Sequence, residues 1–352
     1  MKKFAKIAYR GGVLALSSIL VLSLMFASCD NSSNSDDESS IDNTTSNNNQ
    51  NSNGNSGSNN NSNSNNNNNN NSNDDNADPS QTLPDKVGEN PIKETIKLID
   101  DKWGDYYLEL SPNGTALYVT DDDEPIEELN YTYNVDKKEI QMQVKKIGFY
   151  SILGNNGLMT YSEIISYTNN FTVEKIREVL REMYEEDKNK EWFKDDYPNC
   201  NSYEDYEQAY FKGFNSVEAA LEYEIQVTKL VYKAIFGALA TYSYEIDSDG
   251  KMTLTEKFTG VKNLFESSCE YHESETHVRI YNSEAYFEDS DNDEYFNGFL
   301  DTDEKKIVFK SEDDDKTVTA EYTENISAET VTLKFNNKEY TCKFEGVNFI
   351  QE

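Results

Sequence analysis

Histidine is scarce in this sequence, with two residues among 352, and basic residues are few, with 32 Lys plus Arg against 66 Asp plus Glu. Two histidines leave little material for a histidine-rich metal site or for acid–base catalysis. The net charge of -34 disfavours binding to nucleic acid, because the phosphate backbone is also negative. The composition therefore predicts no cofactor, no bound metal and no nucleic-acid partner.

An apolar run from Val13 to Phe26 is shorter than the about 20 residues that cross a bilayer. It follows a basic start without acidic residues, so residues 1–28 are typical of a removable signal peptide. The run leads into Phe26-Ala27-Ser28-Cys29, which resembles the lipobox of bacterial lipoproteins in the looser form found in spirochaetes. The resemblance implies cleavage before Cys29 and acylation of its thiol. A chance cysteine after an ordinary signal peptide is the alternative.

An acylated Cys29 predicts an exported protein that is attached to the lipid bilayer without a membrane span. We expect it to be lipid-anchored to the cell envelope, in the outer membrane or at the cell surface. Residues 29–84 then form a low-complexity stretch of Asn, Ser, Asp, Gly and Thr, with unbroken asparagine from Asn65 to Asn71. Such a composition predicts a disordered tether with a reach of roughly 40 Å, which would display the folded part. A tract that expanded without function is the alternative.

The folded part is predicted over residues 85–352, which carry nearly all the aromatic residues. Asn90-Pro91 is typical of a helix start, and three isoleucines at helical spacing from Ile92 to Ile99 predict a helix up to Trp103.

Most of the sequence that follows alternates apolar and polar side chains, which is the pattern of strands with one buried face. Turn signals such as Pro112-Asn113-Gly114 and Asp247-Ser248-Asp249-Gly250 separate the runs. This pattern predicts a mainly β fold, an antiparallel up-and-down meander that forms a barrel or a two-layer sandwich. The alternating runs cover residues 129–135, 140–144, 242–246, 252–258, 318–322, 331–335 and 340–344.

Between residues 150 and 237 the spacing of apolar residues changes to 3.6, which predicts an α-helical insertion in the β-domain and an α+β fold. An insertion of this kind is expected to act as a lid or as a docking surface. Helices are expected at Val173–Met183, around Tyr206 and Tyr210, and at Val217–Ala234 after the cap residue Ser216.

Trp103, the tyrosine-rich face of the meander and the last run, Tyr340-Thr341-Cys342-Lys343-Phe344, resemble the lipocalin-like lipoproteins of spirochaetes and Bacteroidetes. The resemblance covers about 103–147 and 240–346 and implies a lipocalin-like β-domain. The Gly-x-Trp motif of true lipocalins is replaced by Asp101-Lys102-Trp103, and the helical insertion has no lipocalin counterpart. No ligand-binding residue can therefore be carried over from lipocalins.

Tyrosine is abundant, with 24 residues in the chain. Tyrosines inside a small barrel either stack on a ligand or fill the interior, and filling is the more frequent use. The candidate ligand-lining residues are Tyr131, Tyr133, Tyr242, Tyr244 and Tyr340.

Cys269, His272 and His277 form the only cluster of cysteine and histidine. Zinc needs three or four converging ligands, and no fourth ligand stands out among the surrounding glutamates, so solvated histidines are the preferred interpretation. The acidic turn from Asp289 to Asp293 imitates the start of a calcium loop but lacks the required glycine and final glutamate.

With Cys29 acylated, three cysteines remain. Cys342 faces inward by parity with its neighbours on the strand, and Cys269 is the other thiol of the sheet. We therefore predict a disulfide between Cys269 and Cys342, with Cys200 free. Three buried, unpaired thiols are the alternative.

The sequence contains no glycine-rich phosphate loop, nucleophile elbow or distinctive carboxylate pair, so we predict that the protein is not an enzyme. The leading hypothesis is a displayed, membrane-anchored lipoprotein whose β-domain binds a small apolar or aromatic ligand or a partner protein. The alternative is a structural or host-contact surface lipoprotein with a solid core and no ligand. A cavity inside the barrel would distinguish the two hypotheses. A cluster of Cys269, both histidines and one acid would favour an enzyme.

Overall fold

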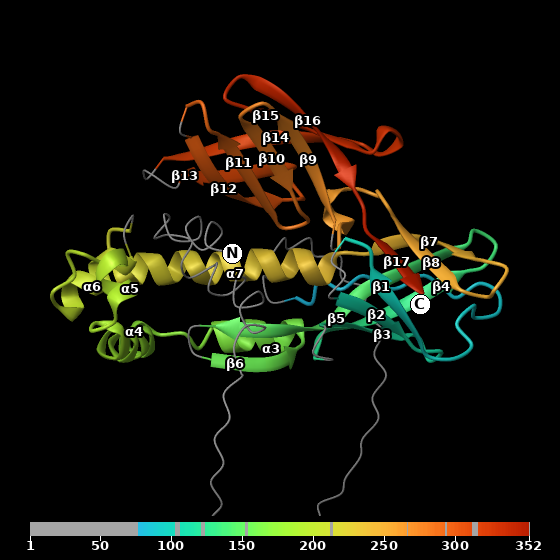
Figure 1. The fold of residues 1–352 in the computed structure, drawn as a ribbon, viewed down its shortest axis with the longest axis horizontal. Coiled ribbons are helices and arrows are strands. Elements are labelled where there is room, and N and C mark those ends of the chain that lie inside the picture. The colour runs from blue at the N-terminus through green and yellow to red at the C-terminus, as the bar shows by residue number, and fades with distance from the viewer. Residues whose placement is uncertain are drawn as a thin grey trace, which may run out of the picture. The chain divides into compact units, whose positions relative to one another are not determined.

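The structure, a computed structural model, describes residues 77–102, 106–120, 124–151, 154–211, 214–265, 267–292, 294–311 and 316–351. The predicted signal peptide, Cys29 and the tether up to residue 76 lie outside these ranges. The described chain is mainly β and forms two antiparallel barrels of eight strands together with a group of helices (Figure 1).

The first barrel combines strands from both ends of the described chain. Its strands are β1 (Ile96–Asp100), β2 (Tyr106–Leu110), β3 (Thr115–Thr120), β4 (Pro125–Asn134), β5 (Glu139–Ser151), β7 (Ala240–Ile246), β8 (Met252–Lys257) and β17 (Asn348–Gln351). The ring order is β4-β3-β2-β1-β17-β8-β7-β5, and β5 pairs back with β4. The C-terminal strand β17 places Ile350 opposite Ile99 of β1 and Phe349 opposite Leu254 of β8, so the last residues of the chain close this barrel.

The second barrel is inserted in the sequence between β8 and β17 of the first. Each strand pairs with the next, and the last strand pairs with the first. Its strands are β9 (Ser268–Glu273), β10 (Thr276–Ile280), β11 (Glu284–Asp289), β12 (Glu294–Asp301), β13 (Lys306–Ser311), β14 (Thr317–Asn325), β15 (Thr330–Phe335) and β16 (Lys338–Glu345). The predicted mainly β, antiparallel barrel fold is confirmed, but the strands form two barrels where one sheet was expected, and neither is a two-layer sandwich.

Two of the second-barrel strands that were not predicted, β11 and β12, have aromatic side chains on both faces. On β11, Phe287 is buried in the interior, whereas Tyr286 next to it lies on the outer face. On β12, Phe296 is buried and the adjacent Tyr295 is not. Because apolar residues are adjacent here, the alternation that predicts a strand is weak, although the backbone pairing is regular.

The helices occupy residues 161–237. They are α3 (Tyr161–Thr168), α4 (Val173–Asp187), α5 (Glu191–Asp196), α6 (Tyr203–Tyr210) and α7 (Val217–Gly237). All except α5 begin at a side-chain cap. The Ser216 hydroxyl accepts a hydrogen bond from the backbone N–H of Ala219 at 3.1 Å, as its predicted role as a cap requires. The helices begin later than residue 150 because β5 continues to Ser151 and pairs with a short strand, β6 (Gly154–Met159). We call α3–α7 the helical segment.

Three apolar clusters hold these elements together, and partly buried Phe171 packs against both the first-barrel cluster and the helical cluster. The first-barrel core also includes Tyr161 and Ile164 of α3 and Tyr232 and Phe236 of α7. The second-barrel core contains residues of β9–β16 and of the segment that leads into them. The helical core contains residues of α4, α5, α6 and the start of α7, among them Leu180. The helical segment therefore belongs partly to the first barrel and partly to a core of its own.

The predicted N-terminal helix up to Trp103 is wrong. The Asn90 side chain accepts the backbone N–H of Ile92 at 2.9 Å, and the chain then forms strand β1 between β2 and β17. Pairing on both edges of β1 outweighs the helical spacing of its isoleucines. Upstream of this strand, the Gln81 side chain donates to the carbonyl oxygen of Gly237 at 2.6 Å, a few residues before the predicted end of the tether at 84.

Candidate functional site

The five predicted ligand-lining tyrosines do not form one site. Tyr131 and Tyr133 lie on β4, and Tyr242 and Tyr244 lie on β7, all four in the first-barrel core. Tyr340 lies on β16 in the second-barrel core. All five side chains are buried.

The tyrosines of the first barrel pack against the protein itself. The Tyr131 hydroxyl donates to the carbonyl oxygen of Ser111 at 2.6 Å and accepts from the Asn90 side-chain amide at 3.4 Å. Burial raises the pKa of Tyr131, and the hydrogen bond from Asn90 opposes this shift. The ring of Tyr242 lies 5.8 Å from that of Phe349, measured between centroids. These contacts are those of side chains that fill a barrel.

Phenylalanine rings occupy the interior of the second barrel. The ring centroid of Phe335 lies 4.6 Å from that of Phe287, 4.8 Å from that of Phe309 and 5.2 Å from that of Phe296. Gly298 of β12 lies against these rings, since a Cβ atom there would be 2.7 Å from the Phe309 side chain. Aromatic pairs at these spacings are in van der Waals contact, so the part of the interior that contains these four rings is packed.

The two cysteines of the second barrel are buried as free thiols, and Cys200 is a half-buried free thiol. Cys269 is directly opposite Phe344, so Cys342 is offset by two positions on the neighbouring strand. Diagonal neighbours of this kind have Cα atoms about 7–8 Å apart, beyond the usual span of a disulfide. Burial raises the pKa of both thiols. The alternative of unpaired thiols therefore describes their state in the structure.

The predicted cluster of Cys269, His272 and His277 is divided between two faces of the barrel wall. Cys269 is buried in the second-barrel core, whereas the histidines lie on the outer face of β9 and β10. Their ring centroids are 5.3 Å apart. Among the residues that the structure describes, no three His, Cys, Asp or Glu side chains converge in a geometry that holds a metal ion.

The acidic turns use their carboxylates for local hydrogen bonds. Asp289 is buried and accepts from the Asn292 side chain at 2.9 Å, while Asp293 lies outside the described residues. The Asp247 carboxylate accepts the backbone N–H groups of Asp249 and Lys251, both at 2.9 Å. These oxygens stabilise turns.

The helical core contains a cluster of aromatic rings in tilted and edge-to-face contacts. Phe193 of α5 lies 5.0 Å from Tyr197 and 5.4 Å from Tyr206 of α6, measured between centroids. Trp192 lies beside this cluster, 5.9 Å from Phe193, and is 46% exposed. A large exposed tryptophan on a rigid aromatic base is a residue type that frequently anchors a protein–protein contact.

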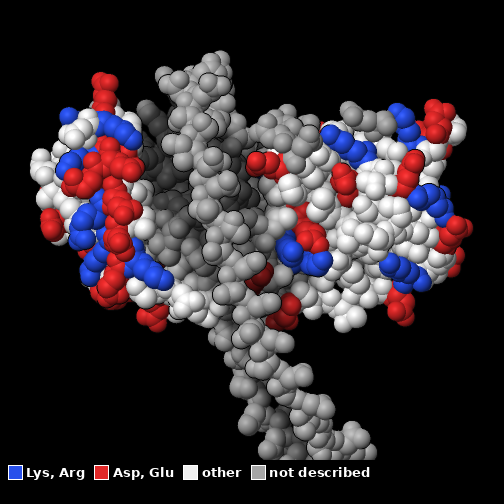
Figure 2. Space-filling model, turned by 90° about the horizontal axis from the view of Figure 1, so that it is seen from below, with Lys and Arg blue, Asp and Glu red and all other residues white. Residues whose placement is uncertain are grey.

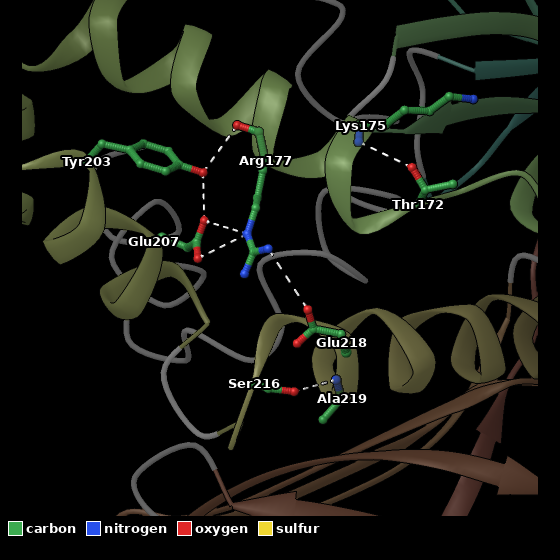
Figure 3. A network of polar contacts seen from close by, with 8 residues as sticks. All are labelled: Thr172, Lys175, Arg177, Tyr203, Glu207, Ser216, Glu218 and Ala219. Carbon is green, nitrogen blue, oxygen red and sulfur yellow. Dashed lines mark hydrogen bonds and ion pairs between the residues drawn. The ribbon is translucent and has the colours of Figure 1, made fainter.

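Figure 3 shows a polar network that joins α4, α6 and α7. Arg177 of α4 contacts Glu207 of α6 at 3.1 Å and Glu218 of α7 at 3.9 Å. The Tyr203 hydroxyl donates to Glu207 at 2.7 Å, and the Arg181 guanidinium lies 4.7 Å from the centre of the Tyr203 ring. Burial, followed by the bond to the Glu207 carboxylate, raises the pKa of Tyr203 to about 12. Nothing in the sequence pattern indicated this network, although two of the four arginines in the chain lie there.

Buried carboxyl groups were also missed, among them Glu224 and Glu256. Glu224 of α7 is 4% exposed, and neither carboxylate oxygen has a hydrogen-bond partner within the described part of the chain. Burial raises the pKa of Glu224 to about 8, and the positive charge of Lys310 opposes the shift. Burial also raises the pKa of Glu256 of β8 to about 7. Neither residue could be distinguished among 66 acidic residues in the sequence.

Acidic and basic side chains are interleaved over the helices at the left of Figure 2, without a large field of one sign. Within the described residues, no helix is both long and apolar enough to cross a membrane.

Comparison of the chain with protein families, with curated proteins and with solved structures finds no significant match.

Proposed function

We propose that this protein is a lipid-anchored lipoprotein of the cell envelope, displayed at the outer membrane or cell surface, that binds a partner protein and is not an enzyme. In this proposal the acyl groups are attached to Cys29, and the tether is the part of residues 29–84 that precedes the contact of Gln81 with Gly237. The two barrels are lipocalin-like scaffolds, and the helical segment is the docking surface.

The packed barrel interiors carry this proposal. A lipocalin-like barrel that takes up a small ligand needs an open interior, whereas Phe335 and the rings around it fill the second barrel. The tyrosines of the first barrel are likewise buried among core side chains. A solid scaffold supports binding on the outside of the protein.

The helical segment is the surface that fits this role best. It combines exposed Trp192 with Arg177 and Arg181, and tryptophan and arginine are enriched where proteins contact each other. Its aromatic core and the ion pair between Arg177 and Glu207 hold these side chains on a fixed frame. A fixed frame lowers the entropy lost on docking.

Site-specific photo-crosslinking tests the proposal. A photoreactive phenylalanine analogue is placed at Trp192 of the displayed, lipidated protein. The matched control position is Val308 on β13, which is 45% exposed against 46% for Trp192. We expect a discrete cross-linked product from position 192 and none from position 308. Saturable uptake of an apolar fluorescent probe, without a specific cross-link from position 192, would overturn the proposal in favour of a small ligand.

The anchor is tested separately by Cys29→Ala. This variant should lose lipid labelling and leave the membrane fraction, because the remaining chain has no acyl group to insert. Detergent partition equal to that of the original protein would contradict the lipoprotein assignment without affecting the docking test.

A further inference from the structure

The two histidines of the chain lie directly opposite each other on one hairpin. Strands β9 and β10 are joined by a two-residue turn of Ser274 and Glu275, and Ser274 has a positive φ of 52°. The register pairs Glu273 with Thr276, and His272 with His277. The positions that flank a two-residue turn exchange both backbone hydrogen bonds, so the next pair is the non-hydrogen-bonded one. At such pairs the Cα atoms are about 4.5 Å apart and the side chains approach most closely.

The spacing of the two imidazole rings fits a shared ion. Their centroids are 5.3 Å apart and the ring planes are inclined at 76°. A tetrahedral ion bound to two imidazole nitrogens at about 2.0–2.1 Å holds the ring centroids about 5 Å apart, because each centroid lies about 1 Å behind its nitrogen. Both rings stand on the outer face of the barrel, where an ion has access from solvent.

A carboxylate lies close to one of the two rings. Nε2 of His277 lies 3.7 Å from Oε2 of Glu270, and Oε1 of the same carboxylate is held by Arg279 at 2.6 Å and by the Ser268 hydroxyl at 2.7 Å. In metal sites a carboxylate near one nitrogen of a histidine orients the ring, so Nδ1 of His277 is the proposed ligand. The ring of Tyr286 on β11 lies 6.1 Å from His277 on its other side.

We propose that His272 and His277 form a two-imidazole site for a divalent transition ion such as Zn²⁺, Cu²⁺ or Ni²⁺. Imidazole nitrogen prefers these ions to Ca²⁺ and Mg²⁺, which take oxygen ligands. Water completes the coordination sphere, in keeping with the lack of a third converging ligand among the described residues. The acidity of the chain, with a net charge of -34, raises the local concentration of cations around the site.

Titration of the full-length, chelator-treated protein with Zn²⁺ and with Cu²⁺ tests the site, with Ca²⁺ as the hard-ion comparison. We expect one transition ion per chain at this site, and Ca²⁺ should not compete for it. His272→Gln and His277→Gln should each raise the dissociation constant for the ion about tenfold or more, because each removes a ligand from the ion. Glu270→Gln, which alters only the positioning carboxylate, should have a smaller effect.

Glu288→Gln is the matched control, since Glu288 is opposite His277 on β11 and is not a proposed ligand. Its affinity for Zn²⁺ should equal that of the original protein. Electron paramagnetic resonance of the Cu²⁺ complex should show coupling to imidazole nitrogen, which does not depend on the folding of any variant. Binding that persists in the double histidine variant, a Cu²⁺ spectrum with oxygen ligands only, or no one-to-one binding would overturn the proposal.

Discussion

The hydroxyl of Ser267 donates a hydrogen bond to the carboxylate of Glu256 at 2.7 Å, and both residues are buried. Glu256 is on β8 of the first barrel, and Ser267 is in the segment that leads into the second. The same carboxylate accepts the backbone N–H of Val347, in the segment that returns to the first barrel, at 3.4 Å. The buried side chain of Glu256 therefore contacts both segments that connect the two barrels.

The pH dependence of stability should report on Glu256. Burial raises its pKa from 4.5 to about 7, against the opposing hydrogen bonds from Ser267 and two backbone N–H groups. The folded state therefore binds an extra proton between these values, and the free energy of unfolding falls as the pH rises from 4.5 to 7. Glu256→Gln keeps an acceptor but does not titrate. Its stability relative to the original protein should increase by about 3 kcal/mol over this range.

Urea denaturation at several pH values measures this difference. Glu321→Gln, at an exposed position on β14, controls for the loss of one negative charge. Curves of stability against pH that run parallel for Glu256→Gln and the original protein would show that the carboxyl does not titrate in the folded state.

A second prediction concerns the strand that closes the first barrel. Phe349 is fully buried, and its ring centroid lies 6.1 Å from that of Tyr118 and 5.8 Å from that of Tyr242. Its neighbour Ile350 is 48% exposed. Phe349→Ala should destabilise the protein by about 3–5 kcal/mol, because it leaves a cavity between aromatic rings. Ile350→Ala should cost about 0.5 kcal/mol or less. Equal losses in chemical denaturation would mean that β17 is not part of the barrel core.

The sequence predicts individual strands well where one face is polar. Tyr131 and Tyr133 alternate with asparagine and threonine, so β4 was predicted within a few residues. A barrel was among the predicted folds, but the strand pairings that close each barrel could not be predicted, because the paired strands are far apart in the chain. Asn348 hydrogen bonds to Asp101 across 247 residues, and nothing local in either segment indicates the other.

The candidate site residues show the same limit. The alternation of apolar and polar residues predicted that Tyr242 and Tyr340 are buried, and both are. It did not indicate that the two residues belong to different barrels. Sequence spacing grouped Cys269 with two histidines, although a strand sends neighbours at odd spacing to opposite faces. His272 and His277 are together because a two-residue turn pairs them, and that turn depends on the positive φ of Ser274.

A third prediction distinguishes free thiols from a disulfide. In the native protein, iodoacetamide should label half-buried Cys200 and leave Cys269 and Cys342 unmodified, because both are fully buried. After unfolding in denaturant without a reducing agent, all three should be labelled, as mass spectrometry of the peptides will show. If Cys269 and Cys342 are labelled only after reduction, the predicted disulfide exists and the strands shift to allow it.

The last prediction concerns the two parts of the helical segment. Tyr161 of α3 and Phe236 of α7 have ring centroids 5.7 Å apart, and Tyr232 lies 5.5 Å from Phe149 of β5, all within the first-barrel core. Replacing residues 152–238 by a Gly/Ser linker removes Tyr161, Tyr232 and Phe236 and leaves Phe149 without its contact with Tyr232. Cooperative unfolding should be lost, because the barrel then lacks part of its core.

A shorter deletion separates the docking surface from the barrel. Replacing residues 172–224 by the same linker removes α4, α5, α6 and the first turns of α7, whose buried residues form the helical core. Because this core is distinct from the first-barrel core, the shortened protein should unfold cooperatively and lose most of its helical circular dichroism. Cross-linking from this segment is lost with it. Loss of cooperative unfolding in the shorter deletion as well would mean that the helical core supports the first barrel, and the separate docking surface would have to be abandoned.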